Sequence, residues 1–153
     1  DTYAKDAVTE YDLMCRAMEQ VFDIEQTQQV IENTENINSV WALVEYGGQP
    51  AITVLAAPST EPDKRRANTA DTFLFWQDKK AAGTGKRILI VTSQIYVPYQ
   101  QLEAARILGM RYGHSVETIG FPREWSGNMS GLQTAANYLQ EIRSVLQSMK
   151  KLL

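Results

Sequence analysis

The chain has 153 residues and a net charge of −3, so it is long enough for a single domain whose core needs no disulfide. The lack of a basic excess argues against a general nucleic-acid binder. One cysteine and one histidine exclude an intrachain disulfide and argue against a structural zinc site. No apolar run approaches the roughly 18 residues of a membrane span, so we expect a soluble, cytoplasmic protein. Because the first residue is Asp1 and not Met, the sequence leaves open whether a leader or another N-terminal segment precedes it.

A helix is predicted near the N-terminus, from about Glu10 to Phe22. Thr9 suits the N-cap, and Asp12 follows three residues later. Cys15 within this stretch is expected to act as a small buried hydrophobe. The polar region that follows contains one further candidate, a short helix around Gln28 to Asn33. The apolar residues of the first helix recur at helical spacing: Tyr11, Met14, Met18, Val21 and Phe22.

A β-hairpin is predicted next. Val40–Tyr46 alternates and is rich in β-forming residues, and Ile52–Ala57 is a second apolar run. The sequence Gly-Gly-Gln-Pro at residues 47–50 between them is a strong turn signal. We expect Val40–Tyr46 to be an antiparallel edge strand of a larger, otherwise parallel sheet.

The central part of the chain predicts a βαβ unit. Ile88–Val91 is an apolar run rich in β-branched residues, typical of a strand buried on both faces. A helical pattern over Tyr99–Met110 and a second strand-like run over Val116–Phe121 follow it, so these two strands should be parallel. Helices are also predicted from about Thr69 to Ala82, capped by Asn68 or Thr69, and from about Leu132 to Lys151. The last helix carries one apolar stripe: Leu132, Ala135, Leu139, Ile142, Leu146 and Met149.

The order of these elements predicts the fold class. From Ile52 onward, strands and helices alternate three times. With right-handed crossovers, this order predicts an α/β fold, namely a three-layer α/β/α Rossmann-like sandwich. Its sheet would be mostly parallel, with an antiparallel edge hairpin. We expect residues 1–153 to form a single domain of this type.

A ligand site is expected where the parallel strands end. Ligands of such sheets bind outside the carboxyl ends of the strands, and free N–H groups of helices that begin there attract anions. Three loops, residues 58–66, 93–98 and 121–130, would meet at this edge and hold a phosphate or carboxylate. Alternatively, Asn68 and Thr69 only cap a helix, the basic triplet 64–66 is a solvated surface, and Tyr96 and Tyr99 pack over the sheet instead of stacking on a ligand ring. The candidate ligand-binding residues are Arg65, Arg66, Asn68, Thr69 and Asp71 on one side, and Thr92, Ser93, Gln94, Tyr96 and Tyr99 on the other.

No specific catalytic motif is present. Phosphate-binding loops of the GxxxxGK[ST] and GxGxxG types are absent. A nucleophilic pair of Ser93 and His114 fails on distance, because a five-residue strand would put about 15 Å between them. His114 is expected to be a surface or turn residue. Asp71 is the candidate general base, a role that requires it to face the crevice with a raised pKa.

Two segments resemble a known family. The run Arg66-Ala67-Asn68-Thr69-Ala70-Asp71-Thr72, followed at a helix's distance by Ile90-Val91-Thr92-Ser93, resembles the SanA/YdcF/ElyC-like family of bacterial proteins. Its members show an N-T-x-[ED]-N type motif that opens a helix, and then a strand that ends in V-T-S. The resemblance covers about residues 53–122. It implies a Rossmann-like fold in which both segments line one pocket, a link to cell-envelope biology, and, through one branch, S-adenosylmethionine or a nucleotide as cofactor.

The chain also departs from that family. The family pattern continues V-T-S-x-x-H-x-x-R. In this chain, Tyr96 stands at the histidine position and Tyr99 at the arginine position. A cationic or general-base role of this turn therefore does not carry over. The family's N-terminal strand is also not visible before Asp1, since the chain opens with a helix and a hairpin.

Three functions follow from these patterns. The first is a domain that binds a small anionic or nucleotide-like ligand at the carboxyl ends of the parallel strands. The second is a hydrolase or transferase that uses Asp71 as a general base. The third is a non-catalytic interaction domain, which would pair with another chain through its exposed helices or through the edge strand Val40–Tyr46.

Overall fold

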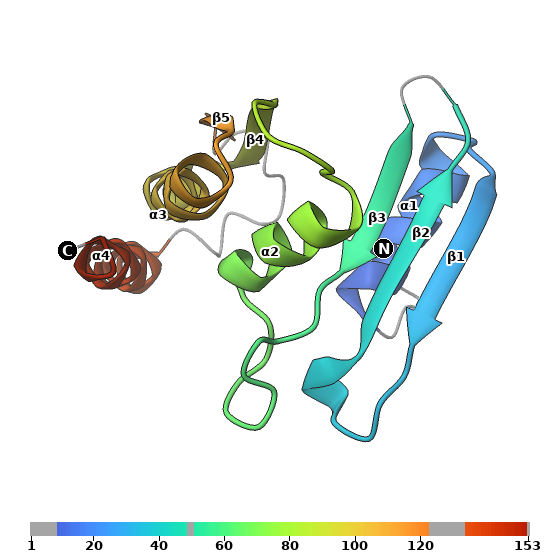
Figure 1. The fold of residues 1–153 in the computed structure, drawn as a ribbon, viewed down its shortest axis with the longest axis horizontal. Coiled ribbons are helices and arrows are strands. Elements are labelled where there is room, and N and C mark those ends of the chain that lie inside the picture. The colour runs from blue at the N-terminus through green and yellow to red at the C-terminus, as the bar shows by residue number, and fades with distance from the viewer. Residues whose placement is uncertain (1–8, 49–50, 123–133, 153) are drawn as a thin grey trace. The chain divides into compact units, whose positions relative to one another are not determined.

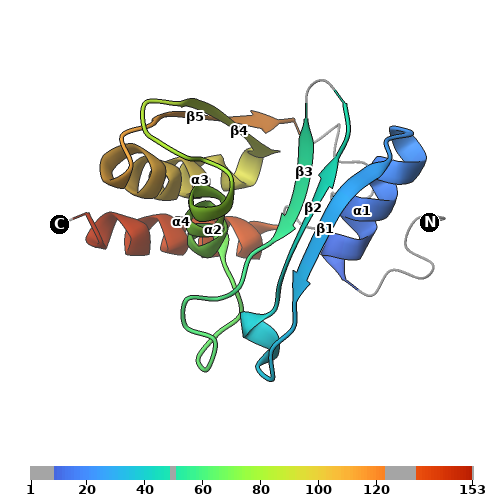
Figure 2. The ribbon, with the colours of Figure 1, turned by 45° about the vertical axis from the view of Figure 1, so that its right-hand side comes forward.

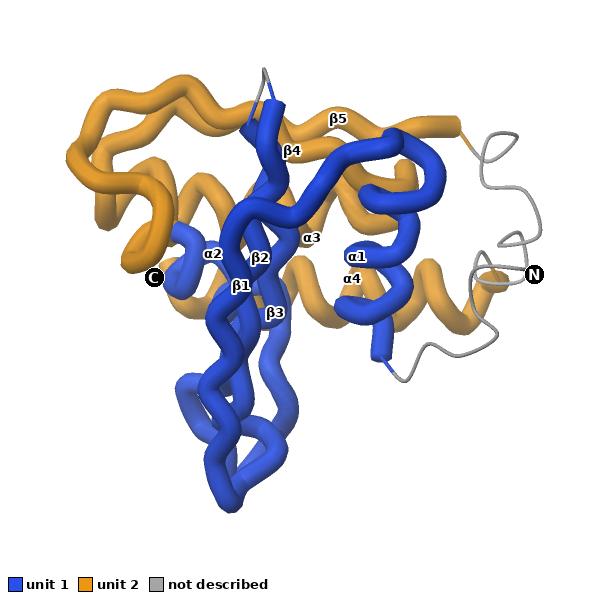
Figure 3. Tube along the Cα trace, turned by 90° about the vertical axis from the view of Figure 1, so that its right-hand side faces the viewer, with its two compact units in different colours: residues 1–76 blue, residues 77–153 orange. Residues whose placement is uncertain are grey.

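The computed structural model describes residues 9–48, 51–122 and 134–152. It forms two compact units, residues 1–76 and 77–153 (Figure 3). Each unit has its own sheet, and the boundary falls within helix α2 (Thr69–Lys79). The prediction of a single domain over residues 1–153 stays a prediction.

Unit 1 is built on an antiparallel sheet with the strand order β1–β2–β3 (Figure 1). The strands are β1 (Gln26–Glu32), β2 (Trp41–Tyr46) and β3 (Ile52–Ala56), and a short 3₁₀ helix, η1 (Ile37–Ser39), precedes β2. The predicted hairpin is confirmed, because β2 and β3 are antiparallel with Tyr46 opposite Ile52. The strand Val40–Tyr46 was predicted at an edge, and that is wrong: β2 is the central strand, paired with β1 on its other side.

Helix α1 (Glu10–Val21) packs on one face of this sheet and forms the core of unit 1 with it. The N-cap prediction is confirmed: the Thr9 hydroxyl accepts a hydrogen bond from the backbone N–H of Asp12, and the Asp12 carboxylate accepts one from the backbone N–H of Thr9. This reciprocal capping satisfies two N–H groups that the helix leaves unpaired. The buried sheet residues of the core are Val44, Tyr46 and Val54, and the α1 residues that pack on them are Tyr11, Cys15 and Met18.

Strand β1 is a second difference from the sequence prediction. A short helix was predicted around Gln28 to Asn33, and the structure instead has a strand whose seven residues are all exposed. Because β1 buries no apolar face, its sequence lacks the alternation of apolar and polar residues that usually identifies a strand. It is fixed by its backbone pairing with β2 and by polar contacts such as the hydrogen bond from the Trp41 indole to Glu32, 3.0 Å long.

Unit 2 contains the predicted βαβ arrangement. Strands β4 (Arg87–Ser93) and β5 (Ser115–Phe121) are parallel, as predicted. The chain between them forms a short 3₁₀ helix, η2 (Gln94–Tyr96), then α3 (Val97–Ala104), which continues into a π-helical segment, η3 (Ala105–Arg111). Helix α3 packs on one face of the β4–β5 sheet and on helix α4 (Ala135–Lys150), so α3 lies between them (Figure 2).

The predicted fold class is wrong. The parallel sheet has two strands, and the third predicted member, β3, belongs to the separate antiparallel sheet of unit 1. The molecule is therefore α/β, but it is not a three-layer Rossmann-like sandwich with a mostly parallel sheet. The hairpin explains the difference in physical terms: β3 finds its partner across a turn of a few residues, so pairing with β2 closes a much shorter loop than pairing with β4 would.

His114 lies in the turn before β5, as predicted, but it is buried, at 6% exposure. Its Nδ1 accepts a hydrogen bond from the backbone N–H of Lys86 (3.2 Å), and its Nε2 lies 2.7 Å from the Gln77 side-chain oxygen. An N–H on Nε2 that donates to Gln77 satisfies both contacts. The strand register places His114 and Ser93 at opposite ends of the sheet, so the exclusion of a Ser–His pair is confirmed.

Candidate functional site

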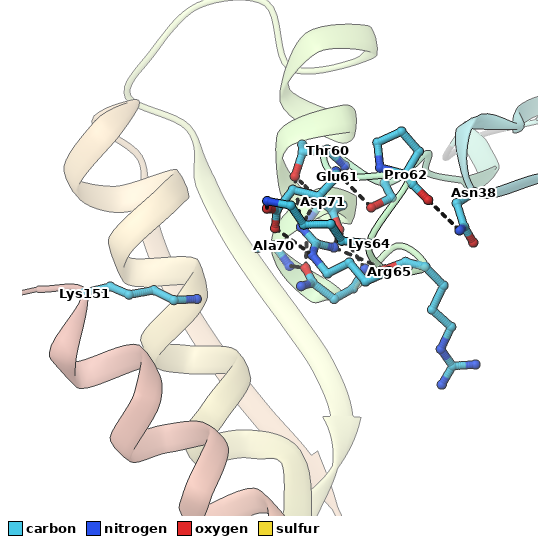
Figure 4. Close-up of polar contacts among 12 residues, drawn as sticks. Asn38, Thr60, Glu61, Pro62, Lys64, Arg65, Ala70, Asp71 and Lys151 are labelled. Carbon is cyan, nitrogen blue, oxygen red and sulfur yellow. Dashed lines mark hydrogen bonds and ion pairs between the residues drawn. The ribbon is translucent and has the colours of Figure 1, made fainter. Parts of the chain in front are cut away.

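The first predicted group of ligand-binding residues forms a closed polar cluster at the N-terminus of α2 (Figure 4). Asp71 is 2% exposed, and its carboxylate accepts hydrogen bonds from the Thr60 hydroxyl (2.7 Å), the Thr60 N–H (3.1 Å) and the Asn68 N–H (2.8 Å). The Asn68 side-chain oxygen accepts in turn from the N–H groups of Ala70 and Asp71. Asn68 and Asp71 are thus the two members of a capping box.

Arg65 completes this cluster. Its guanidinium donates to both carboxylate oxygens of Asp71, through Nη1 to Oδ2 and through Nη2 to Oδ1 at 3.2 Å. Nη2 also donates to the Thr60 hydroxyl (2.9 Å), and Nε donates to Glu61 (3.1 Å). A two-pronged arginine–carboxylate pair of this kind is among the stronger polar contacts in proteins. All three guanidinium nitrogens therefore have partners within unit 1.

These contacts decide the ionisation of Asp71. Burial by itself would raise the pKa of this carboxyl, but hydrogen bonds from Arg65, Thr60 and Asn68 outweigh burial and lower the pKa to about 2. The hydrogen bond to Asp71 raises the pKa of Arg65. A general base at Asp71 was predicted to need a raised pKa, and the structure does not meet that condition.

The same contacts oppose the binding of an external anion at the N-terminus of α2. The first turn of α2 already has a negative charge at its N-terminus, since the Asp71 carboxylate lies there. An incoming phosphate would have to displace it from Arg65 and from the Asn68 N–H. Thr69 is the first residue of α2, and Arg66 is exposed.

The second predicted group lies in unit 2, at the carboxyl end of β4. Thr92 and Ser93 are the last residues of β4, both half-buried, and Gln94 opens η2. Tyr96 and Tyr99 follow in η2 and α3 and are half-buried as well. Helix η2 runs directly into α3, so the N–H of Val97 bonds to the Gln94 carbonyl; Ser93, the N-cap of η2, makes no side-chain cap bond.

The structure therefore brings Arg65, Asn68 and Asp71 together in unit 1, and Thr92 through Tyr99 together in unit 2. Most of the third predicted loop, residues 123–130, lies outside the described part of the chain. No metal-binding group of three or more histidine, cysteine, aspartate or glutamate side chains occurs among the described residues.

Helix α4 exposes most of the apolar stripe that the sequence predicts. Four apolar side chains, which we name the α4 stripe, face outward: Leu139 is 68% exposed, Ile142 56%, Leu146 55% and Met149 50%. The sequence predicts this same stripe, but a stripe of this kind normally faces the core of its own chain. The α4 side chains that are buried or half-buried are mainly polar: Asn137, Glu141, Ser144, Val145 and Ser148.

A buried carboxylate on α3 fixes this orientation. Glu103 is fully buried and accepts a hydrogen bond from the Ser148 hydroxyl on α4. It also pairs with Arg106 at 2.5 Å, and the Lys151 ammonium lies 3.8 Å away. Burial would raise the pKa of Glu103, but hydrogen bonds from Arg106 and Ser148 lower it. Because a buried carboxylate left without donors is costly, these contacts hold the polar side of α4 against α3.

Comparisons with known proteins give relatives without an assigned function. The chain is 35% identical over 161 residues to uncharacterised proteins of Mycobacterium bovis and of two strains of Mycobacterium tuberculosis. Each match covers 98% of this chain and 44% of the relative, so the chain spans less than half the length of these proteins. No family model matches the chain. No solved structure matches it. Within the part of the chain that the structure describes, no helix is long and apolar enough to cross a membrane.

Proposed function

We propose that this chain is a non-catalytic interaction domain that contacts its partner through the α4 stripe. The observation that carries the proposal is the orientation of α4, which buries Ser148 against Glu103 and leaves Leu139, Ile142 and Leu146 at least half exposed. A contiguous exposed apolar surface with a polar surround is typical of a protein–protein contact.

The spacing within the stripe supports a helical or sheet-like partner. Leu139, Ile142, Leu146 and Met149 are separated by three, four and three residues, which is the a/d pattern of helices that pack lengthwise along another element. The residues that follow Ile142 and Met149 are Arg143 and Lys150, both exposed. The stripe is thus apolar along its centre and cationic along one side.

The test is an association measurement with matched variants. Leu146→Glu places a charge in the stripe, and Met110→Glu places one at another exposed apolar residue of unit 2, 75% exposed. Sedimentation velocity would measure self-association, and fluorescence anisotropy would measure binding of a synthetic amphipathic helix with leucine at a and d and glutamate at e and g. We expect the wild type and Met110→Glu to associate in at least one assay, and Leu146→Glu to lose that association. A wild type that associates in neither assay would refute the proposal.

A second candidate is a small anionic ligand at the carboxyl end of β4, for which the start of η2 at Ser93, without a side-chain cap and next to Thr92, is the supporting observation. The resemblance to the SanA/YdcF/ElyC-like family adds S-adenosylmethionine and nucleotides to the compounds worth testing. A thermal-shift screen with these compounds and with sugar phosphates would reveal a binder, since a ligand in excess of its dissociation constant raises the melting temperature. A hit should be lost in Ser93→Ala; a hit that this variant retains would rule out the site.

A further inference from the structure

Unit 2 has a second exposed apolar surface besides the α4 stripe. It is the face of the β4–β5 sheet that is turned away from α3, which we name the outer sheet face (Figure 2). Along most of both strands, exposed side chains alternate with half-buried ones. On the exposed side, Leu89 is 57% exposed, Val91 61% and Ile119 44%. Because Val91 lies opposite Ile119 in the register, these three side chains form one patch.

The charged side chains of the outer sheet face lie together at its amino-terminal end. Arg87 lies opposite Ser115, and Glu117 lies opposite Leu89 in the next exposed pair along the strands. Arg87 and Glu117 are both exposed, and neither makes an ion pair with another described residue. A shallow hollow of about 240 Å³ lies beside both side chains. The face is therefore apolar at one end and carries one cation and one anion at the other.

A face with one charge of each sign is complementary to a second copy of itself. In a two-fold dimer, both copies use the same patch. If the two-fold axis runs along the strands, β4 of one copy lies over β5 of the other, and each register pair lies over its own counterpart. Val91 of one copy then packs on Ile119 of the other, and the two charged ends meet.

The same axis brings opposite charges together. Glu117 of the second copy lies over β4 of the first, two residues or about 6.6 Å along the strand from Arg87. Packed sheets lie about 10 Å apart, so the two Cα atoms are about 12 Å apart, a gap that extended arginine and glutamate side chains bridge. An axis across the strands would turn one sheet end for end and separate these charges. The charges therefore favour the axis along the strands.

We propose that two copies of this chain pack face to face through the outer sheet face, with Arg87 of each copy paired with Glu117 of the other. This contact does not use the α4 stripe, so it goes beyond the proposed function. Helix α3 separates α4 from the sheet in each copy, so the stripe stays exposed in the dimer and is available to a further partner.

The size of the outer sheet face sets the strength of this dimer. Seven residues of β4 or β5 span about 23 Å, and the two strands lie about 4.8 Å apart. The contact is therefore smaller than the roughly 1,200 Å² of total buried area at which stable interfaces begin. We expect a weak dimer, with a dissociation constant above about 1 μM.

The first test is sedimentation equilibrium on the full chain from about 10 μM to about 1 mM, with circular dichroism to confirm folding. We expect a concentration-dependent dimer for the wild type. Val91→Glu places a charge in the centre of the contact and should weaken dimerisation by at least tenfold. Met110→Glu and Leu146→Glu place the same charge at exposed apolar residues outside the outer sheet face, so both should dimerise like the wild type.

Exchange of the charges gives the decisive test. Arg87→Glu makes both charges of the face negative, and Glu117→Lys makes both positive. Each variant alone should dimerise at least tenfold more weakly than the wild type, because like charges then meet twice. An equimolar mixture should form a heterodimer at least as strong as the wild-type dimer, because both ion pairs form again between the two variants. A partner other than a second copy would not give this rescue.

Three results would overturn the dimer. One is a wild type that stays monomeric up to about 1 mM. Another is a mixture of the two charge variants that associates no more strongly than either variant alone. The third is self-association that Leu146→Glu removes and Val91→Glu leaves intact, which would support the proposed function instead. If Val91→Glu removes self-association and Leu146→Glu retains it, the dimer is supported, and binding of the amphipathic helix then tests the α4 stripe by itself.

Discussion

Replacing Asp71 with asparagine should destabilise the protein in a way that depends on pH. The folded chain lowers the pKa of Asp71 from its ordinary 3.8 to about 2, and this shift corresponds to about 2 kcal/mol of folding free energy at neutral pH. Because the folded-state pKa is the lower one, this stabilisation is complete well above pH 4 and is lost as the pH falls toward 2. Asp71→Asn removes the charge that Arg65 and the Asn68 N–H contact, so it should cost about 2 kcal/mol at pH 7. For a chain of this length, the melting temperature should fall by roughly 4–8 °C.

The assay is urea denaturation of the wild type and Asp71→Asn at pH 7 and at pH 3. At pH 3 about half of the linked stabilisation is lost, so the difference between the two proteins should narrow by about 1 kcal/mol. Asp78→Asn is the matched control, because Asp78 lies on the same helix with a side chain that is 72% exposed. The control should leave the free energy of unfolding unchanged at both pH values. A difference between wild type and Asp71→Asn that is the same at pH 7 and pH 3 would refute the electrostatic reasoning.

Three further substitutions test other contacts, each by chemical denaturation. Gly120→Ala should cost about 1–3 kcal/mol, because an added Cβ would lie 2.6 Å from the Cα of Gln94 and force β5 away from η2; unchanged stability would contradict that close approach. Glu103→Gln should cost about 1–3 kcal/mol, because it removes the buried carboxylate that accepts from Ser148 and Arg106, and its effect should shrink at low pH since the pKa of Glu103 is lowered in the fold. His114→Ala should cost about 1–3 kcal/mol through the loss of two buried hydrogen bonds, and a neutral result would show that water replaces them.

The elements that the sequence predicts correctly are those fixed by local chemistry. The capping box of Thr9 and Asp12 places the start of α1 within the sequence itself. The Gly-Gly-Gln-Pro turn between two β-rich runs similarly fixes the β2–β3 hairpin. The βαβ unit from β4 to β5 follows from two apolar runs separated by a helix-length segment. In each case, the deciding interactions lie within about thirty residues of chain.

The predictions that failed depend on pairings that side-chain periodicity does not encode. Strand β1 is fully exposed, so only its backbone pairing with β2 identifies it as a strand. Strand β3 has an apolar sequence that suits either a hairpin or a parallel sheet, and its partner decides between them. The element order and the directions of the β2–β3 and β4–β5 pairs were therefore predicted correctly, while strand β1 and the division of the strands into two sheets were not.

The polar motif at the start of α2 illustrates the same limit for the site. Asn68 followed three residues later by Asp71 is a capping-box spacing, and it also matches the motif of the resembled family. Sequence alone does not separate a carboxylate that faces a ligand from one that faces its own helix end. The position of Arg65 separates them here, because a guanidinium bound to both carboxylate oxygens leaves Asp71 ionised and occupied.

The α4 stripe shows why an amphipathic pattern predicts a helix more reliably than it predicts what the helix covers. The spacing of Leu139, Ile142 and Leu146 predicts that one side of the helix contacts an apolar neighbour. It does not indicate whether that neighbour belongs to the same chain. The polar side carries the deciding information, because the fully buried Glu103 needs the Ser148 hydroxyl and so turns that side of α4 inward. Under the proposed function, the exposed leucines of α4 make their apolar contact with a partner. On strands β4 and β5, the apolar side chains of Leu89, Val91 and Ile119 are exposed as well.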